Sequence, residues 1–183
     1  MAEAKPFIPV KYISGIIFSR PDILAEAEAR LVDRLGAIDL RSPEFAFALT
    51  DYYEKQMGEG LSRVFLSFEE LGPPERLSAV KLQTNAWEEE IRVKAGASLR
   101  IVNIDPGYLT ASALFMATAK DFAHRVALRD GIYAHLELLF TRTGVRYLDW
   151  TYPDFRQEGP AEFFRMVRTS YLAQLIANRD RLG

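Results

Sequence analysis

Hydrophobic residues in the first half of the chain recur with the two periods that distinguish strands from helices. Apolar and β-branched residues crowd the first segment and alternate with other residues in later ones, which predicts four strands. Apolar residues with helical spacing mark two further segments. The predicted elements are a strand over residues 7–18, a helix over 24–35, strands over 45–49 and 64–68, a helix over 77–91 and a strand over 99–104.

This order, β-α-β-β-α-β, is that of a ferredoxin-like sandwich. The second half predicts an antiparallel β-meander and then a C-terminal helix that begins near Gly159-Pro160. The strands of the meander are predicted over residues 114–118, 124–128, 132–140 and 145–149. Because no linker, repeat or low-complexity segment interrupts the chain, we expect an α+β fold in which residues 1–183 form a single domain.

The turn at Arg129-Asp130-Gly131 predicts a β-hairpin between two strands of the meander. A two-residue Asp-Gly turn would place Ile132 opposite the arginine, whereas a three-residue loop with a left-handed glycine would place Ile132 opposite Leu128. We favour the three-residue loop because it pairs apolar residues with each other. It also places Arg125 opposite His135.

The second predicted helix carries a polar line, Lys81, Asn85 and Glu88, beside its apolar stripe. Such a line either points at a site or forms a solvated network of neighbouring turns, and the sequence leaves both interpretations open. The strand that follows runs into Asn103-Ile104-Asp105-Pro106-Gly107-Tyr108, in which Pro-Gly is typical of a turn. Because side chains alternate along a strand, we expect Asn103 and Asp105 to share a face and to project toward the polar line.

Composition and charge exclude several classes of protein. The chain has 183 residues, of which 49% are hydrophobic and 26% charged, as is ordinary for a globular protein. A net charge of −2 gives no basic field for nucleic acid, and no apolar run approaches the ~20 residues of a membrane helix. The chain contains no cysteine, which excludes disulfides and thiolate chemistry and suits a reducing compartment. We therefore expect a cytoplasmic protein without nucleic-acid or membrane partners.

Acidic and basic residues near predicted turns are candidate ligands for a metal and an anion. The acidic candidates supply the hard oxygen ligands that suit Mg²⁺ or Mn²⁺; they are Asp51, Asp105 and Asp154. The candidate ligand-binding residues are Lys81, Asn85, Asn103, Lys120, Arg125, Tyr152 and Arg156. Cations that hold phosphate oxygens beside carboxylates that hold a metal fit phosphoryl or nucleotidyl chemistry. An aspartate before Pro-Gly is, however, most often a turn residue.

Two histidines and one aspartate are the candidate catalytic residues. His124 and His135 are candidate proton carriers, because histidine titrates near neutral pH without perturbation. Asp105 is the third candidate. A structural role explains either histidine equally well, and neither has a nucleophile as partner. Tyr152 belongs to an aromatic segment that could stack on a base or a sugar, although a packed loop explains it too. No Walker A loop and no Gly-x-Gly-x-x-Gly string is present.

Several unusual strings occur in one order along the chain. They are Pro9-Val10-Lys11, residues 50–58, Asn103-Ile104-Asp105-Pro106-Gly107-Tyr108, Lys120-Asp121 with His124-Arg125, Gly131-Ile132-Tyr133-Ala134 and residues 150–156. Together they resemble the prokaryotic family called domain of unknown function 4416, over nearly the whole chain. Phe155 stands where that family has tyrosine. The resemblance implies a stand-alone protein of about this length and supplies no established catalytic residues to carry over. Some members carry the label GTP-binding protein.

Three hypotheses of function remain. The first is an enzyme that acts on a phosphorylated or nucleotide substrate with Mg²⁺. The second is a non-catalytic module for a small anion or GTP. Both describe a phosphate- or nucleotide-handling protein with a polar cleft. The third is a structural or interaction protein, such as a homo-oligomer. The first two require one set of side chains to meet in one cleft, namely Asp51, Lys81, Asp105, Lys120, Arg125 and Asp154.

Overall fold

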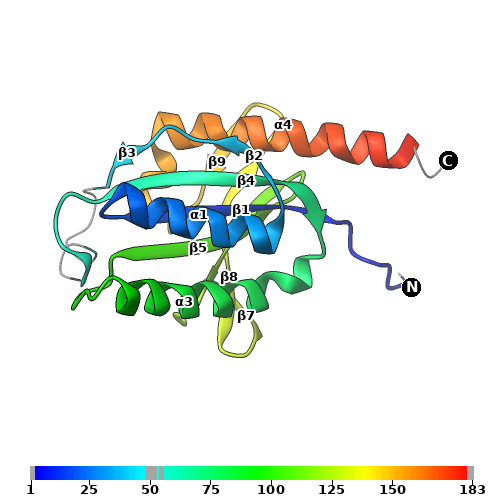
Figure 1. Ribbon diagram of the computed structural model, residues 1–183. Helices are drawn as coiled ribbons and strands as arrows, with labels where there is room; N and C mark the ends of the chain where they lie inside the picture. The colour runs from blue at the N-terminus through cyan, green and yellow to red at the C-terminus, as the bar shows by residue number, and fades with distance from the viewer. Residues whose placement is uncertain (1–2, 48–52, 54–55, 181–183) are drawn as a thin grey trace.

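The computed structural model of the chain describes residues 3–47, 53 and 56–180, with side chains up to residue 178 (Figure 1). The described residues contain a nine-stranded antiparallel sheet, three α-helices and two short 3₁₀-helices. The elements are β1 (Val10–Phe18), α1 (Pro21–Leu35), β2 (Ile38–Arg41), β3 (Phe45–Ala46), β4 (Ser62–Gly72), η1 (Pro74–Arg76), α3 (Leu77–Lys94), β5 (Val102–Leu109), β6 (Ala113–Thr118), β7 (Arg125–Arg129), β8 (Ile132–Phe140), β9 (Val145–Tyr147), η2 (Pro153–Arg156) and α4 (Glu158–Asp180). Among these residues, no helix is long and apolar enough to cross a membrane.

The first half of the sheet has the strand order of a ferredoxin-like sandwich. Strands β5, β1, β4 and β2 lie side by side, and each pairs antiparallel with its neighbour. The meander continues the sheet beyond β5 through β6, β8 and β7. The α+β class, the antiparallel extension of the sheet and the C-terminal helix are therefore confirmed, although β6 pairs with β8 and not with the consecutive β7.

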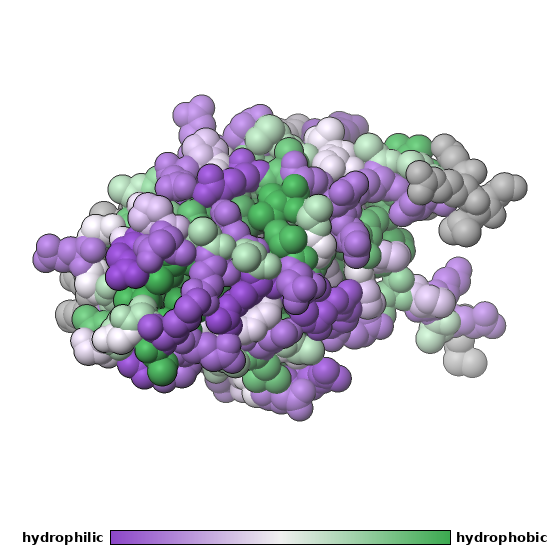
Figure 2. Space-filling model, in the orientation of Figure 1, coloured by the Kyte–Doolittle hydropathy of each residue, from purple (hydrophilic) through white to green (hydrophobic). Residues whose placement is uncertain are grey.

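Helices cover both faces of the sheet. The apolar stripes of α1 and α3 pack with Ile16, Phe18 and Ile104 in one core. Helix α4 packs its stripe against Ile13 and Phe65 in a second core on the other face. In Figure 1, α4 accordingly lies apart from α1 and α3. Hydrophilic side chains cover most of the outer surface seen in the same view (Figure 2), as expected for helices whose apolar stripes face the sheet.

The second strand lies earlier in the chain than predicted. The strand that pairs with the central part of β4 is β2, Ile38–Arg41, whereas β3 is limited to Phe45–Ala46. Strand β2 is a half-exposed edge of the sheet, so its Ile-Asp-Leu-Arg pattern carries a weaker hydrophobic signal than the alternating phenylalanines that follow it. Residues 48 and 49 of the predicted strand lie outside the described residues.

The predicted turn at Pro106-Gly107 is wrong, because both residues lie inside β5. Strand β5 pairs with β1 from Val102 to Leu109, but it pairs with β6 only from Gly107 onward. The backbone of Ile104 bonds to side chains of α3, on the edge away from β1. Pro106, two residues further on, presents its hydrogen-free nitrogen to that same open edge. The missing N–H therefore leaves no strand pairing unsatisfied.

The β7–β8 hairpin combines features of both predicted turns. Asp130 and Gly131 both have positive φ, 55° and 75°, as in a two-residue type I′ turn, and Arg129 pairs with Ile132. The predicted three-residue loop is therefore wrong. A bulge after Ala127 nevertheless restores the other predicted pairing, and Arg125 lies opposite His135.

We predict that Gly107→Ala destabilises the fold by about 1–3 kcal/mol, the usual effect of overpacking. A Cβ at this position would overlap the backbone oxygen of Phe115 and lie 2.5 Å from Met116 Sδ, because β6 joins β5 here at close range. Urea unfolding followed by circular dichroism measures the change. Gly159→Ala, which meets nothing within 4 Å, is the matched control and should be neutral or slightly stabilising. Equal effects of the two substitutions would contradict the prediction.

Candidate functional site

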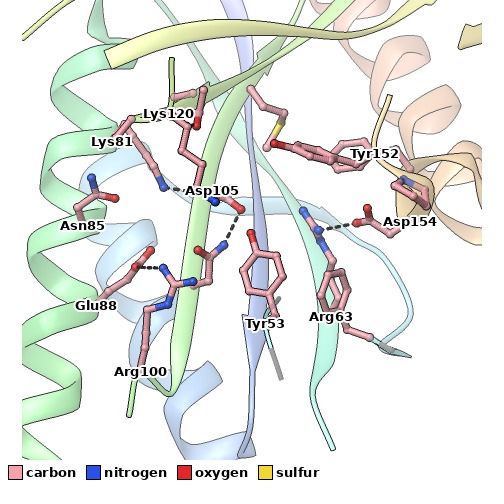
Figure 3. Close-up of a pocket in the computed structure, with 18 residues that line it drawn as sticks. Tyr53, Arg63, Lys81, Asn85, Glu88, Arg100, Asp105, Lys120, Tyr152 and Asp154 are labelled. Carbon is pink, nitrogen blue, oxygen red and sulfur yellow. Dashed lines mark hydrogen bonds and ion pairs between the residues drawn. The ribbon is translucent and has the colours of Figure 1, made fainter. Parts of the chain in front are cut away.

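A cavity of about 490 Å³ lies beside the part of β5 that β6 leaves unpaired. Its walls come from α3, β4, β5, the end of β6 with the loop after it, and η2 with the residue before it. Figure 3 shows the polar side chains of these elements turned toward the common space. Residues far apart in the sequence therefore meet where two strands separate.

The polar line of α3 faces β5 and completes its hydrogen bonds. Lys81 Nζ donates to the backbone oxygen of Ile104 at 3.0 Å and to Asp105 Oδ1 at 2.9 Å. The backbone N–H of Ile104 donates to Glu88 Oε1 at 2.7 Å. Asn85 lies between Lys81 and Glu88 on α3 and also lines the cavity (Figure 3). The polar line therefore faces the cavity, and its role in binding stays a prediction.

Asp105 is held as a carboxylate at the centre of this wall. Asn103 Nδ2 donates to its Oδ2 at 2.5 Å, so the two side chains share a face as predicted. Burial acts to raise the pKa of Asp105, but the charges of Lys81 and Arg63 and the hydrogen bonds from Lys81 and Asn103 outweigh it and hold that pKa below its ordinary value. A carboxylate of this kind accepts hydrogen bonds at neutral pH and is a poor proton donor.

Arg63 forms the opposite wall and was missed by the sequence analysis. Its guanidinium is buried among the rings of Phe47, Phe65 and Phe155, with centroids 4.7–5.5 Å away, and forms an ion pair with Asp154. Its Nε has no hydrogen-bond partner among the described residues. The one available signal was a single arginine at the start of an otherwise apolar strand segment, Arg63-Val64-Phe65-Leu66.

Arg100 and Tyr53 close the cavity beside Glu88. Arg100 Nη1 donates to Glu88 Oε2 at 3.3 Å, and its guanidinium lies 5.7 Å from the centre of the Tyr53 ring. Burial raises the pKa of Glu88, against the opposing effect of the Lys81 charge. In Figure 3, Tyr53 lies between Asp105 and Arg63. The rest of the predicted segment 50–55 lies outside the described residues.

Arg125 lies behind the wall of the cavity and ties three of its neighbours together. It donates from Nε to His135 Nδ1 at 3.2 Å, from Nη1 to the backbone oxygen of Lys120 at 2.8 Å, and from Nη2 to the Tyr152 hydroxyl at 2.9 Å. Lys120 and Tyr152 both line the cavity, whereas Arg125 does not. Arg125 is therefore placed to position this wall and lies outside the cavity lining.

His135 and Glu137 form a buried pair on β8. His135 Nε2 lies 3.0 Å from Glu137 Oε2, without a well-aligned hydrogen bond between them, and Glu137 Oε1 accepts the backbone N–H of Tyr152 at 2.6 Å. Burial, the charge of Arg125 and the neighbouring His124 lower the pKa of His135 to about 4. Burial and the charge of Asp154 raise the pKa of Glu137 to about 8, although the Tyr152 N–H opposes this. Both side chains are therefore neutral at pH 7.

His124 and Arg156 contact neighbouring protein groups and do not line the cavity. The His124 ring stacks on Trp150 with centroids 4.8 Å apart and meets the edge of His135. Burial and the charge of Arg125 lower the pKa of His124. Arg156 donates to backbone oxygens of Leu148, Asp149 and Thr151 and so fixes the loop before η2.

The predicted site residues fall into three groups. The cavity lining includes Lys81, Asn85, Asn103, Asp105, Lys120, Tyr152 and Asp154. The lining does not include His124, Arg125, His135 or Arg156. Asp51 lies outside the described residues. The predicted polar cleft thus gathers most of its members, and the predicted proton carriers lie behind its wall.

The predicted magnesium site lacks a complete set of ligands in the part of the chain that the structure describes. No three acidic or histidine side chains there are grouped to hold a metal ion. Asp105 faces Lys81 and Asp154 faces Arg63, so each carboxylate already has a cation as partner. With Asp51 undescribed, metal binding stays a prediction.

The buried pair predicts a specific pH dependence of stability. Folding raises the pKa of Glu137 from 4.5 to about 8, so its contribution falls as pH rises between these values. Folding lowers the pKa of His135 from 6.5 to about 4, so its contribution rises with pH over that range. The two effects oppose each other up to pH 6.5. Above pH 6.5, Glu137 is the only member of the pair whose contribution still changes. It should reduce the free energy of unfolding by on the order of 2 kcal/mol toward pH 8.

Glu137→Gln should remove this decrease and leave the rise below pH 6.5. Urea unfolding at pH 5, 6.5 and 8 measures both effects. Glu162→Gln, which removes one exposed carboxylate on α4, is the matched control. Parallel stability curves for Glu137→Gln and the native chain would contradict the assignment.

Comparison with known proteins identifies a family without assigning a function. Neither the curated proteins nor the solved structures that were searched contain a match to this chain. One family model, described as Domain of unknown function (DUF4416), matches residues 8–171 of the 183 residues, a range that includes every residue of the cavity wall. The chain therefore belongs to the family Domain of unknown function (DUF4416).

Proposed function

We propose that the chain binds a small phosphate-bearing anion in the cavity between β5 and β6. The observation that carries this proposal is the convergence of four cationic side chains on one cavity; they are Arg63, Lys81, Arg100 and Lys120. They come from separate parts of the chain, and the amides of Asn85 and Asn103 lie beside them. Guanidinium, ammonium and amide groups are the usual donors to phosphate oxygens.

The charge and size of the cavity support such a ligand. Among the described residues of the lining, three carboxylates, Glu88, Asp105 and Asp154, accompany the four cations, an excess of one formal positive charge. A volume of about 490 Å³ lies within the range of roughly 300–1,000 Å³ that small-molecule sites occupy. An anion would therefore gain both enclosure and a favourable field.

The arrangement favours binding over catalysis. The pKa of Asp105 is held low, which suits an acceptor and not a general acid. His124 and His135 lie outside the cavity lining, and their pKa values are lowered. We therefore prefer a non-catalytic module to an enzyme, in the reducing cytoplasm that a cysteine-free chain suits. A divalent cation that accompanies the ligand's phosphate could still contact Asp105 or Asp154.

We predict that phosphate-bearing metabolites raise the melting temperature of the protein, whereas their unphosphorylated counterparts do not. A hundredfold excess of ligand over its Kd adds about 2.7 kcal/mol, or roughly 5–10 °C for a chain of this size. Differential scanning fluorimetry with ribose 5-phosphate and ribose, each with Mg²⁺ or EDTA, measures the effect. Stabilisation that requires Mg²⁺ would favour the metal-dependent hypothesis, and no stabilisation by any phosphate would contradict the proposal.

Lys120→Gln should weaken ribose 5-phosphate binding about tenfold, the usual effect of losing one charged hydrogen bond. Lys94→Gln is the matched control, because Lys94 lies outside the cavity lining and pairs with Glu26 at the surface. Isothermal titration calorimetry compares the two variants, which have the same net charge. Equal affinities in both would show that Lys120 does not contact the ligand.

A further inference from the structure

Tyr152 presents an aromatic face to the cavity, because its polar groups are engaged elsewhere. Its hydroxyl accepts a hydrogen bond from Arg125 at 2.9 Å, and its backbone N–H is bound by Glu137. Its ring stacks on His135 with centroids 5.1 Å apart and planes 24° apart. Tyr152 nevertheless lines the cavity and remains 40% exposed. What it offers a ligand is therefore the flat surface of its ring.

The ring is held in place before any ligand arrives. His135 and Glu137 are buried side chains of β8, and Arg125 reaches Tyr152 from β7. Thr151, the residue before it, donates from its hydroxyl to the backbone oxygen of Glu137. A side chain that is already ordered loses little conformational entropy on binding. An aromatic surface fixed in this way suits a planar partner, since stacking depends on orientation.

The other groups of the cavity fit the remaining parts of a molecule that carries such a ring. The cations fit a phosphate, whereas the carboxylates of Asp105 and Asp154, each already paired with one cation, have lone pairs left for further hydrogen-bond donors. A phosphate alone has no group that satisfies these acceptors. A sugar hydroxyl or an exocyclic amino group does. Figure 3 shows Asp105, Tyr152 and Asp154 around the same space.

We propose that the ligand is a nucleoside monophosphate whose base stacks on Tyr152 and whose phosphate meets the cationic side chains of the cavity. The inference rests on the proposed function and deepens it by adding the class of ligand. In this arrangement the sugar lies between base and phosphate, within reach of the carboxylates. The base lies on Tyr152, with His135 on the opposite side of that ring.

Affinities for ligands with and without a base test the inference. Isothermal titration calorimetry on the full chain compares inorganic phosphate, ribose 5-phosphate and the monophosphates AMP, GMP, CMP and UMP. We expect at least one monophosphate to bind roughly ten- to a hundredfold more tightly than ribose 5-phosphate, the contribution of one base stacked on an aromatic side chain. Tyr152→Leu should remove this difference and leave the affinity for ribose 5-phosphate unchanged. Tyr152→Phe, which keeps the ring, should retain most of it.

Each outcome decides one of the two proposals. If ribose 5-phosphate binds as tightly as every monophosphate, or if Tyr152→Leu weakens both kinds of ligand equally, the stacked base is wrong and phosphate binding stands. If no phosphate binds, the proposed function fails and the inference fails with it. A measurement on the native chain covers the case in which Tyr152→Leu does not fold. Base protons stacked on Tyr152 should shift upfield in the ¹H NMR spectrum of the bound monophosphate, and unshifted base protons would overturn the inference.

Discussion

The separation of β6 from the first half of β5 is the constraint on which the site depends. A strand in the interior of a protein cannot leave its backbone groups unpaired, because each buried N–H or C=O needs a partner. Ile104 lies at the open edge and finds its partners in the side chains of Lys81 and Glu88. Both side chains bring charge into a buried place. The cavity and the polar character of its wall thus have one origin, which is a strand edge completed by a helix.

Buried charges then determine the rest of the lining. A charge removed from water needs a partner of opposite sign and further hydrogen bonds. Lys81 is matched by Asp105, Arg100 by Glu88 and Arg63 by Asp154. Asn103 and Ile104 supply hydrogen bonds to two of these carboxylates. Loss of one member therefore leaves its partner uncompensated, so a substitution within a pair perturbs the fold together with the site. Substitution of Lys120 leaves these three pairs intact, so it tests binding more directly than substitution of one of their members.

Sequence patterns predicted the fold class and the polar wall formed by α3 and β5. They did not predict the arginines of the cavity or the burial of His135. Periodicity gave the helices and most strands, and alternation placed Asn103 and Asp105 on one face, because both signals are local. Pro106-Gly107 misled because the same residues serve a turn or a strand edge, and only the position of β6 distinguishes the two cases. Arg63 and Arg100 were missed because their roles depend on Asp154 and Glu88 and thus on contacts distant in sequence. The positions of His135, buried against the Tyr152 ring, and of His124, stacked on Trp150, depend on tertiary contacts that a local pattern does not show.

The hydrogen bonds and ring contacts that hold Tyr152 also fix the surface on which we propose that a ligand stacks. Burial raises the pKa of Glu137 to about 8 and lowers that of His135 to about 4, and neither side chain belongs to the cavity lining. The pair is therefore better suited to hold Tyr152 and the loop before η2 than to transfer protons to a ligand. A wall that does not reorganise converts more of its contact energy into affinity. In the proposed complex, the buried pair contributes to binding through the rigidity of Tyr152, and the polar residues of β8 need no catalytic role to explain their position.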